Sequence, residues 1–168
     1  LPISTNSQIM YCSNPQGDLR KSSNGGQNFG SMLTDNTTGE SGQWVTPFVI
    51  DMAKPDNLYA GYRRVWKSTD KGSSWKPTGN FPNNPGALVN CIAVSESNNS
   101  WIYVSSGAGF FYSTDGGVAW AQRTALPFGA GNISSIAVSK QNNQRVCVTV
   151  SQFGAANVYE SLNGGETW

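Results

Sequence analysis

The stretch FYSTDGGVAW at residues 111–120 places a serine, an aspartate, two glycines and a tryptophan within eight residues. A serine close to an aspartate in a glycine-rich loop fits either catalytic machinery or the hydrogen bonds of a tight turn. The same spacing occurs in RKSSNGGQNF (20–29), WKSTDKGSSW (66–75) and YESLNGGETW (159–168). The pattern S-x-[DN]-x-G-x-x-[WF] therefore starts four times, at intervals of 46, 45 and 48 residues, which indicates an internal repeat.

Short apolar runs flank each copy of this pattern. The unit that ends in WKSTDKGSSW contains FVI at 48–50 and LYAGY at 58–62, separated by a polar turn with Pro, Asp and Asn. The next unit has the same order, with CIAV at 91–94 and WIYV at 101–104. Runs of about five residues that are rich in Val, Ile, Tyr and Trp and bounded by turn residues indicate β-strands.

The chain is therefore predicted to be all-β. No stretch carries apolar residues at helical spacing over three turns. Four strands in a unit of about 45 residues is the period of a propeller blade. We predict one domain, a partial β-propeller of about three and a half four-stranded antiparallel blades, with units at approximately 1–43, 44–88, 89–131 and 132–168.

The residue types of the repeated loop suit a tight hairpin. Glycine permits the positive φ that such a turn demands, and Asp or Asn before it can bond the backbone two residues further on. The serine hydroxyl offers a further local partner, and the closing aromatic side chain covers the hairpin, so Trp75, Trp120 and Trp168 should be mostly buried. Asn24 and Asn163 keep the acceptor oxygen but lose the charge, an exchange that a general base does not survive. The loops are therefore predicted to be structural.

These loops resemble the Asp-box, also called the bacterial neuraminidase repeat, which occurs in sialidases, sortilin-like receptors, xyloglucan-active glycosidases and many secreted bacterial proteins. The resemblance implies a structural hairpin that joins the third and fourth strands of a blade, away from the central binding face. The run that begins TPFVID and ends VWKSTDKGSSW (46–75) is also similar to sortilin-like propeller regions in large proteins of Bacteroidetes. The matching residues are Ser22, Asn24, Gly26, Phe29, Ser68, Asp70, Gly72, Trp75, Ser113, Asp115, Gly117, Trp120, Ser161, Asn163, Gly165 and Trp168.

The composition favours an extracellular protein. Charged residues make up 12% of the chain, about half the usual share, while Gly, Asn and Ser are plentiful. The net charge of +1 shows no electrostatic footprint for nucleic acid or an anionic membrane, and no apolar run is long enough to span a bilayer. We therefore expect a secreted or cell-surface protein with no nucleic-acid partner and no membrane span.

Three cysteines, Cys12, Cys91 and Cys147, each lie in an apolar run. They are interpreted as small buried hydrophobic residues rather than as a disulfide framework. The sequence has no CxxC spacing and no histidine, so neither a metal site nor a cofactor is expected.

The absence of histidine from the sequence also excludes Ser-His-Asp and Cys-His nucleophilic schemes. Glycoside hydrolysis needs only two carboxylates about 5 to 10 Å apart, so it stays open. Asp56, Asp70 and Asp115 are assigned to turns, and no partner can be paired from sequence with the remaining candidates, Asp51, Glu96, Glu160 and Glu166. No catalytic residue is therefore assigned, and the arginines lack the surrounding motif of a sialidase.

Two functions remain. The favoured one is a binding or scaffolding module for polysaccharide or protein, because the chemistry is sparse and the fold exposes loops around a central face. The alternative is a fragment of a polysaccharide-active glycoside hydrolase, xyloglucanase-like or sialidase-like, whose second acid lies in other blades.

The ends of the repeat suggest an incomplete ring. Aligning IMYCS (9–13) with NLYAG (57–61) places Leu1 in the first strand of its blade, and Trp168 closes a hairpin with no fourth strand after it. We expect part of a larger propeller, since unpaired sheet edges are a liability. Self-association that completes the ring is the alternative.

Overall fold

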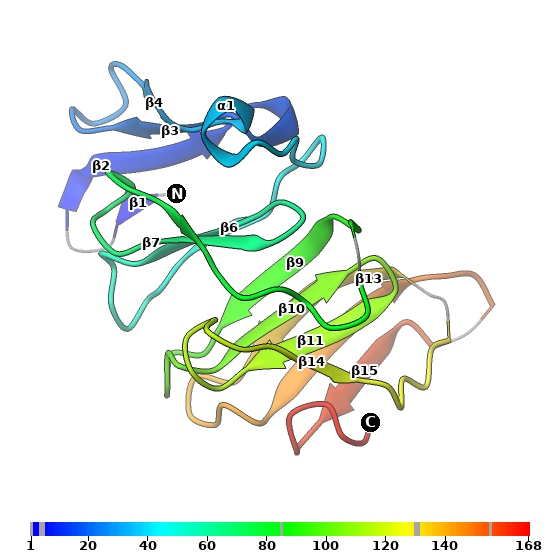
Figure 1. Ribbon diagram of the computed structural model, residues 1–168. Helices are drawn as coiled ribbons and strands as arrows, with labels where there is room; N and C mark the ends of the chain where they lie inside the picture. Colours follow the sequence, from blue (N-terminus) through cyan, green and yellow to red (C-terminus); the bar gives the residue numbers. More distant parts are fainter. Residues whose placement is uncertain (1, 4–5, 85, 130–131, 155) are drawn as a thin grey trace.

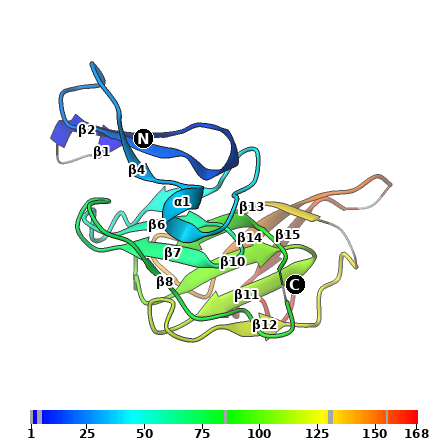
Figure 2. The same ribbon diagram turned by 45° about the horizontal axis from the view of Figure 1, so that its top comes forward.

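The structure is a computed structural model that describes residues 2–3, 6–84, 86–129, 132–154 and 156–168. Within these residues the strands form four antiparallel sheets that lie side by side in chain order (Figure 1, Figure 2). Helix in this part of the chain is limited to a 3-10 turn, η1 (Pro15–Gly17), and a short α-helix, α1 (Asp35–Thr38). Leu1, which the repeat alignment places in a first strand, lies outside the described residues.

Each sheet is built from strands that follow one another along the chain. The first contains β1 (Pro2–Ile3), β2 (Asn6–Ser13), β3 (Leu19–Ser22) and β4 (Gly30–Leu33). The second contains β5 (Phe48–Ile50), β6 (Leu58–Gly61), β7 (Val65–Ser68) and β8 (Lys76–Pro77). The third contains β9 (Val89–Val94), β10 (Ile102–Ser106), β11 (Gly109–Ser113) and β12 (Ala121–Arg123). The fourth contains β13 (Asn132–Val138), β14 (Val146–Ser151) and β15 (Val158–Ser161).

This arrangement is that of propeller blades. Every pairing within a sheet is antiparallel and joins neighbours in the sequence. The first strands of neighbouring sheets meet, since β9 packs against β5 on one side and β13 on the other. The prediction of an all-β chain with the architecture of a partial propeller is confirmed.

Apolar side chains fill the space between neighbouring blades. β10 is buried along its whole length because the blades on either side cover both of its faces. Consecutive residues of a strand point to opposite faces, so Phe110 packs between the third and fourth blades and Phe111 between the second and third. Complete burial of each ring contributes about 2 to 3 kcal/mol. The blades are therefore held together by their side-chain layers.

Connections between antiparallel strands alternate between the two ends of a blade. The hairpins that follow the third strands therefore lie at the same end as the loops between first and second strands. Backbone hydrogen bonds join the two kinds of connection, from Lys71 N to Asp56 O and from Gly116 N to Ser100 O. We term this end the hairpin face. Its four repeat hairpins are residues 22–29, 68–75, 113–120 and 161–168.

The opposite end is termed the loop face, and its connections are tied to one another. Gln43 Nε2 donates to Val89 O at 3.0 Å and to Asn90 Oδ1 at 2.6 Å, across two blades. Asn90 Nδ2 in turn donates to Gly107 O at 2.9 Å. These bonds join the loops of neighbouring blades to one another. The segments of this face are residues 14–18, 34–47, 62–64, 80–84, 86–88, 107–108, 124–129, 152–154 and 156–157.

Candidate functional site

Ser113 is at the centre of the hydrogen bonds in the third repeat hairpin. Its buried hydroxyl donates to Asp115 Oδ1 at 2.7 Å and accepts from the backbone N–H of Gly117 at 2.9 Å. The Asp115 carboxylate accepts from the backbone N–H of Ala119 at 3.0 Å. Gly117 adopts a φ of 96°, a conformation that glycine reaches without strain. The serine and the acid are thus both occupied by their own loop.

The other three hairpins repeat these contacts with either aspartate or asparagine. The serine hydroxyl reaches the side-chain oxygen of residue 24, 70 or 163 at 2.8, 2.8 and 2.9 Å. The glycine N–H reaches the serine at 2.9, 2.8 and 2.7 Å in the same order. Asn24 and Asn163 accept the same backbone N–H group that Asp115 accepts, so the hairpin does not depend on a charge.

One detail of the predicted turn is wrong. The acid was expected to bond the backbone two residues further on, but that N–H belongs to the glycine and bonds the serine hydroxyl. The acid accepts the N–H four residues further on, which is Ser74 in the second hairpin at 2.8 Å. The positive φ of the glycine turns the chain back over the serine, so the serine oxygen is the acceptor within reach.

The closing aromatic residues pack against the apolar layers between blades. Trp120 has 8% of its surface exposed, and Trp75 and Trp168 are partly buried. Trp75 Nε1 donates to Gly72 O of its own hairpin at 3.2 Å. Trp120 Nε1 instead reaches Thr78 Oγ1 of the preceding blade at 3.3 Å. The aromatic residue thus closes its hairpin and, in the third blade, also contacts the neighbour.

The hairpin acids are ionised at neutral pH. Hydrogen bonds from the hydroxyl and N–H of Ser74, and from Ser68, lower the pKa of Asp70 to about 2. The N–H of Ala119 and the hydroxyl of Ser113 also lower the pKa of Asp115. Both carboxylates are therefore fixed acceptors, a state that suits a turn and does not suit a general acid.

The four acids for which the sequence offered no partner all have one. Asp51 is buried, and its Oδ2 accepts from Asn57 Nδ2 at 3.2 Å and from Asn99 Nδ2 of the next blade at 2.8 Å. The others form ion pairs that contribute at most about 1 kcal/mol each. These pairs are Lys140–Glu96 at 3.4 Å, Arg145–Glu160 at 2.7 Å and Arg123–Glu166 at 3.1 Å, and Asp56 likewise pairs with Lys71 at 3.4 Å.

Cys12, Cys91 and Cys147 are free thiols. All three are partly buried rather than fully buried, which corrects the expectation of core residues. Burial raises the pKa of Cys91, whose thiol lies 3.6 Å from Ile133 O of the next blade. Cys91 thus lies at a contact between two blades, and none of the three thiols forms a disulfide.

A groove of about 440 Å³ opens on the loop face. Glu40 lies in it with 10% of its side chain exposed, and its carboxylate accepts from Arg63 N at 2.7 Å and Arg64 Nε at 3.4 Å. Arg63 Nη1 also donates to Gly86 O at 2.6 Å, and this bond links the second blade to the loop that leads into the third. The groove is lined by Glu40, Arg63, Arg64, Asn80, Phe81, Asn83, Asn84 and Gly86.

The charges of three carboxylates act on the buried Tyr62, which precedes Arg63 of this groove in the chain. Burial raises the pKa of Tyr62, and the charges of Asp35, Asp18 and Glu40 raise it further. The Tyr62 hydroxyl donates to Gly17 O. Burial opposes ionisation of Asp18, but hydrogen bonds from Arg20 and Asn14 outweigh it and lower its pKa.

The sequence-based prediction missed this cluster. Asp18, Asp35 and Glu40 are spread over more than twenty residues of the sequence and share no motif. Their shared location could have been predicted only from topology, because all three lie in connections that the alternation of strands places on the loop face.

An exposed apolar pair lies in the same loop as Glu40. Trp44 and Val45 have 72% and 75% of their surfaces exposed. The neighbouring Gln43 fixes their position through its bonds to the start of β9. Because Trp44 and Val45 are adjacent and both exposed, they form an apolar patch that is a candidate binding surface.

Neither a metal centre nor a membrane span is found in the described part of the chain. Its Cys, Asp and Glu side chains form no group of three that could hold an ion. No helix there is long and apolar enough to cross a bilayer.

Solved structures show the same architecture at low sequence identity. An ancestral GH74 enzyme has a TM-score of 0.70 and 24% identity, over 89% of this chain and 21% of its own. A GH74 enzyme of Niastella koreensis has a TM-score of 0.72 and 22% identity, over 99% of this chain and 28% of its own. YCF48 bound to D1 peptide has a TM-score of 0.58 and 13% identity, over 100% of this chain and 44% of its own.

These similarities concern the fold alone. All three identities lie below 25%, and the chain spans less than half the length of each of these structures. No protein-family model matches the sequence, and no curated protein gives a significant match. The architecture that the chain shares with GH74 and YCF48 proteins is that of a β-propeller.

Proposed function

We propose that the chain is a segment of a larger propeller that binds polysaccharide through its loop face. The observation that carries the proposal is the exposed Trp44, held by a structured loop whose Glu40 lies in the loop-face groove. An indole face stacks on the apolar face of a sugar ring. The amides of Asn80, Asn83 and Asn84 supply both donors and acceptors for sugar hydroxyls.

The rest of the molecule supports this assignment. In our proposal the four repeat hairpins are Asp-box hairpins with a structural role, since Ser113 and its counterparts bond only their own loops. The low charge content favours a secreted or cell-surface location. The likeness to two GH74 enzymes supports a role on polysaccharide, and that to YCF48 with its peptide supports a protein ligand as the alternative partner.

Calorimetric titration with xyloglucan oligosaccharides and other β-glucan oligosaccharides tests the proposal. We expect saturable binding that Trp44→Ala weakens at least tenfold, which corresponds to about 1.4 kcal/mol. Leu162→Ala is the matched control, because this residue is 66% exposed on the hairpin face and should leave binding unchanged. Binding that is equal in both variants would contradict a loop-face site.

The carboxylates of Asp18, Asp35 and Glu40, whose charges all act on Tyr62, favour one second candidate, glycoside hydrolysis in the longer protein. In that case turnover of a β-glucan or a sialoside should release reducing ends or sialic acid. It should fall by at least a hundredfold in Glu40→Gln or Asp35→Asn. Saturable binding without turnover would eliminate the hydrolase. Turnover that one of these substitutions abolishes would eliminate a purely binding role.

A further inference from the structure

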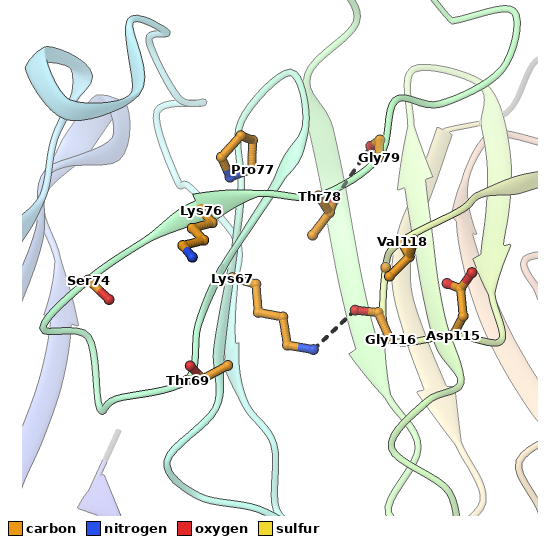
Figure 3. A pocket seen from close by; sticks show the side chains of 11 residues that line it. Lys67, Thr69, Ser74, Lys76, Pro77, Thr78, Gly79, Asp115, Gly116 and Val118 are labelled. Atoms are coloured by element: carbon orange, nitrogen blue, oxygen red, sulfur yellow. Dashed lines mark hydrogen bonds between the residues drawn. The ribbon is translucent and has the colours of Figure 1, made fainter.

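A second cavity opens beside the repeat hairpins of two blades and shares no lining residue with the loop-face groove. It measures about 610 Å³ and lies between the second and third blades (Figure 3). β7, β8 and the second hairpin form one wall, and the third hairpin forms the other. We term it the inter-blade groove. It is lined by Lys67, Thr69, Ser74, Lys76, Pro77, Thr78, Gly79, Asp115, Gly116, Gly117 and Val118.

The inter-blade groove holds a half-buried ammonium group. Lys67 Nζ donates to Gly116 O at 3.2 Å and lies over the ring of Tyr59, 5.2 Å from its centre. An ammonium group has three N–H donors, and Gly116 O is the acceptor found for it among the described residues. Figure 3 shows Lys67 pointing across the cavity, so donors remain for a molecule that enters it.

The charge balance in the inter-blade groove is positive. Burial lowers the pKa of Lys67; the charges of Asp51 and Asp115 raise it and that of Lys54 lowers it. Asp51 is buried among amide donors, and Figure 3 shows the Asp115 carboxylate turned away from Lys67, toward its own hairpin. Lys76, whose side chain is exposed, supplies a second cation on the same wall.

The equivalent gap between the third and fourth blades is filled by side chains. By strand register, Tyr112 there takes the place of Lys67, and Arg123 takes the place of Thr78. Arg123 lies 4.1 Å from the Tyr112 ring centre and donates to Gly164 O at 3.1 Å. A cavity of about 170 Å³ remains beside it. The open groove is therefore not a necessary consequence of the repeat.

We propose that the inter-blade groove binds an acidic oligosaccharide, with a sugar carboxylate seated between Lys67 and Lys76. The volume of about 610 Å³ falls in the range of small-molecule sites. Hydroxyl groups of Thr69, Ser74 and Thr78 line the remainder. Ser74 Oγ donates to Asp70 Oδ2 at 2.6 Å, and its oxygen, like those of the threonines, can accept from sugar hydroxyls. This site does not depend on the loop-face proposal, because the two grooves share no lining residue.

Calorimetry and amide NMR with trigalacturonate, using the full chain, test the proposal. We expect saturable binding with amide shifts at Gly79, Gly116 and Gly117, and none with neutral cellotriose. Lys76→Met should weaken binding at least tenfold. Because the Lys76 side chain is exposed, the substitution leaves the fold intact. Lys67→Met should abolish binding. Lys140→Met, on an exposed side chain of the fourth blade, is the matched control and should change nothing.

Three outcomes would overturn the proposal. The first is no saturable binding of trigalacturonate by the folded chain. The second is equal binding by Lys76→Met and the Lys140→Met control. The third is equal or tighter binding of triglutamate at the same amides, which would assign the inter-blade groove to an acidic peptide. Loss of trigalacturonate binding at 0.5 M salt together with the Lys76→Met effect would support an ionic contact.

Discussion

Two neighbouring gaps between blades contain hairpins of the same repeat but differ in the volume that their side chains leave open. Between the second and third blades Lys67 and Thr78 border a cavity of about 610 Å³, whereas between the third and fourth blades Tyr112 and Arg123 leave about 170 Å³. Trp101, whose rings stack on Tyr112 at 6.1 Å, takes the register position of Asn57 in the open gap. The hairpin backbone is therefore common to both gaps, and three side chains per blade decide whether a gap is filled.

The comparison separates what the repeat fixes from what it leaves variable. In both gaps a cation of one blade donates to a backbone carbonyl of the next hairpin, from Lys67 to Gly116 O and from Arg123 to Gly164 O. The gap between the first and second blades has the same contact, in which Lys21 Nζ donates to Lys71 O at 2.8 Å. The link between blades is thus a constant, while the space beside it is free to vary and can acquire a ligand.

The largest effects should come from the apolar layers beneath the two gaps, and they should be equal. Phe111→Ala empties a site between the second and third blades, and Phe110→Ala one between the third and fourth; both side chains are fully buried. We expect each to lower the free energy of unfolding by about 3 to 5 kcal/mol. Urea denaturation followed by tryptophan fluorescence measures this. A loss of unfolding free energy below 1 kcal/mol at one site would show that the apolar layer beneath that gap is loosely packed.

The hairpins should also respond alike, at a smaller scale. Ser113→Ala and Ser161→Ala each leave the glycine N–H of their hairpin without its acceptor. We expect each to lower the free energy of unfolding by about 1 to 3 kcal/mol. Ser134→Ala, an exposed serine on β13, serves as the control in the same denaturation experiment. Losses that differ by more than 2 kcal/mol would mean that the hairpins are not equivalent.

Opening the filled gap should have an effect of about 1 kcal/mol. Arg123→Thr places in the filled gap the residue type of Thr78 and removes the contact with the Tyr112 ring and the bond to Gly164 O. The melting temperature should fall by a few degrees, and Lys140→Thr, an exposed control, should leave it unchanged. An unchanged melting temperature in Arg123→Thr would indicate that the filling side chains contribute no stability.

The smallest expected effect is on the stability of the fold at low pH. Because the folded pKa of Asp70, about 2, lies below its ordinary value of 3.8, this carboxylate stabilises the fold above about pH 4. That contribution is lost as the pH falls toward 2. Asp70→Asn should leave stability at pH 7 nearly unchanged and reduce its decline between pH 4 and 2. A pH series of thermal melts checks this, and an identical decline in both proteins would be inconsistent with the assigned hydrogen bonds.

The fold could be predicted because the same turn residues recur at the same spacing in four copies of the repeat. Ser113, Asp115 and Gly117 sit within five residues, so their contacts are local and follow from spacing. The error over which N–H the acid accepts has the same origin, since backbone direction at a positive-φ glycine is not encoded in residue type. The place of Cys91 beside Ile133 depended on how two blades meet, which local patterns do not determine.

The candidate sites could not be predicted in the same way. Lys67 and Gly116, or Arg63 and Glu40, are brought together by contacts between blades or loops that are more than twenty residues apart. Their spacing carries no motif, and a cavity is a property of what neighbouring side chains leave unfilled. Once the topology is known, however, sorting residues by connection type places Glu40 and Trp44 on the loop face and Lys67 beside the hairpin face.

The central claim is that the repeat hairpins serve the fold, and Asp115→Asn tests it most directly. This substitution reproduces the side chain that residues 24 and 163 already carry. We predict that the variant melts within about 2 °C of the parent at pH 7, because the acceptor oxygen is kept. It should bind xyloglucan oligosaccharide as tightly as the parent does, and trigalacturonate at least as tightly, because a negative charge is removed from the lining of the inter-blade groove. Unchanged melting together with a tenfold or greater loss of either binding, or of any turnover, would contradict the claim and make the hairpin a working site.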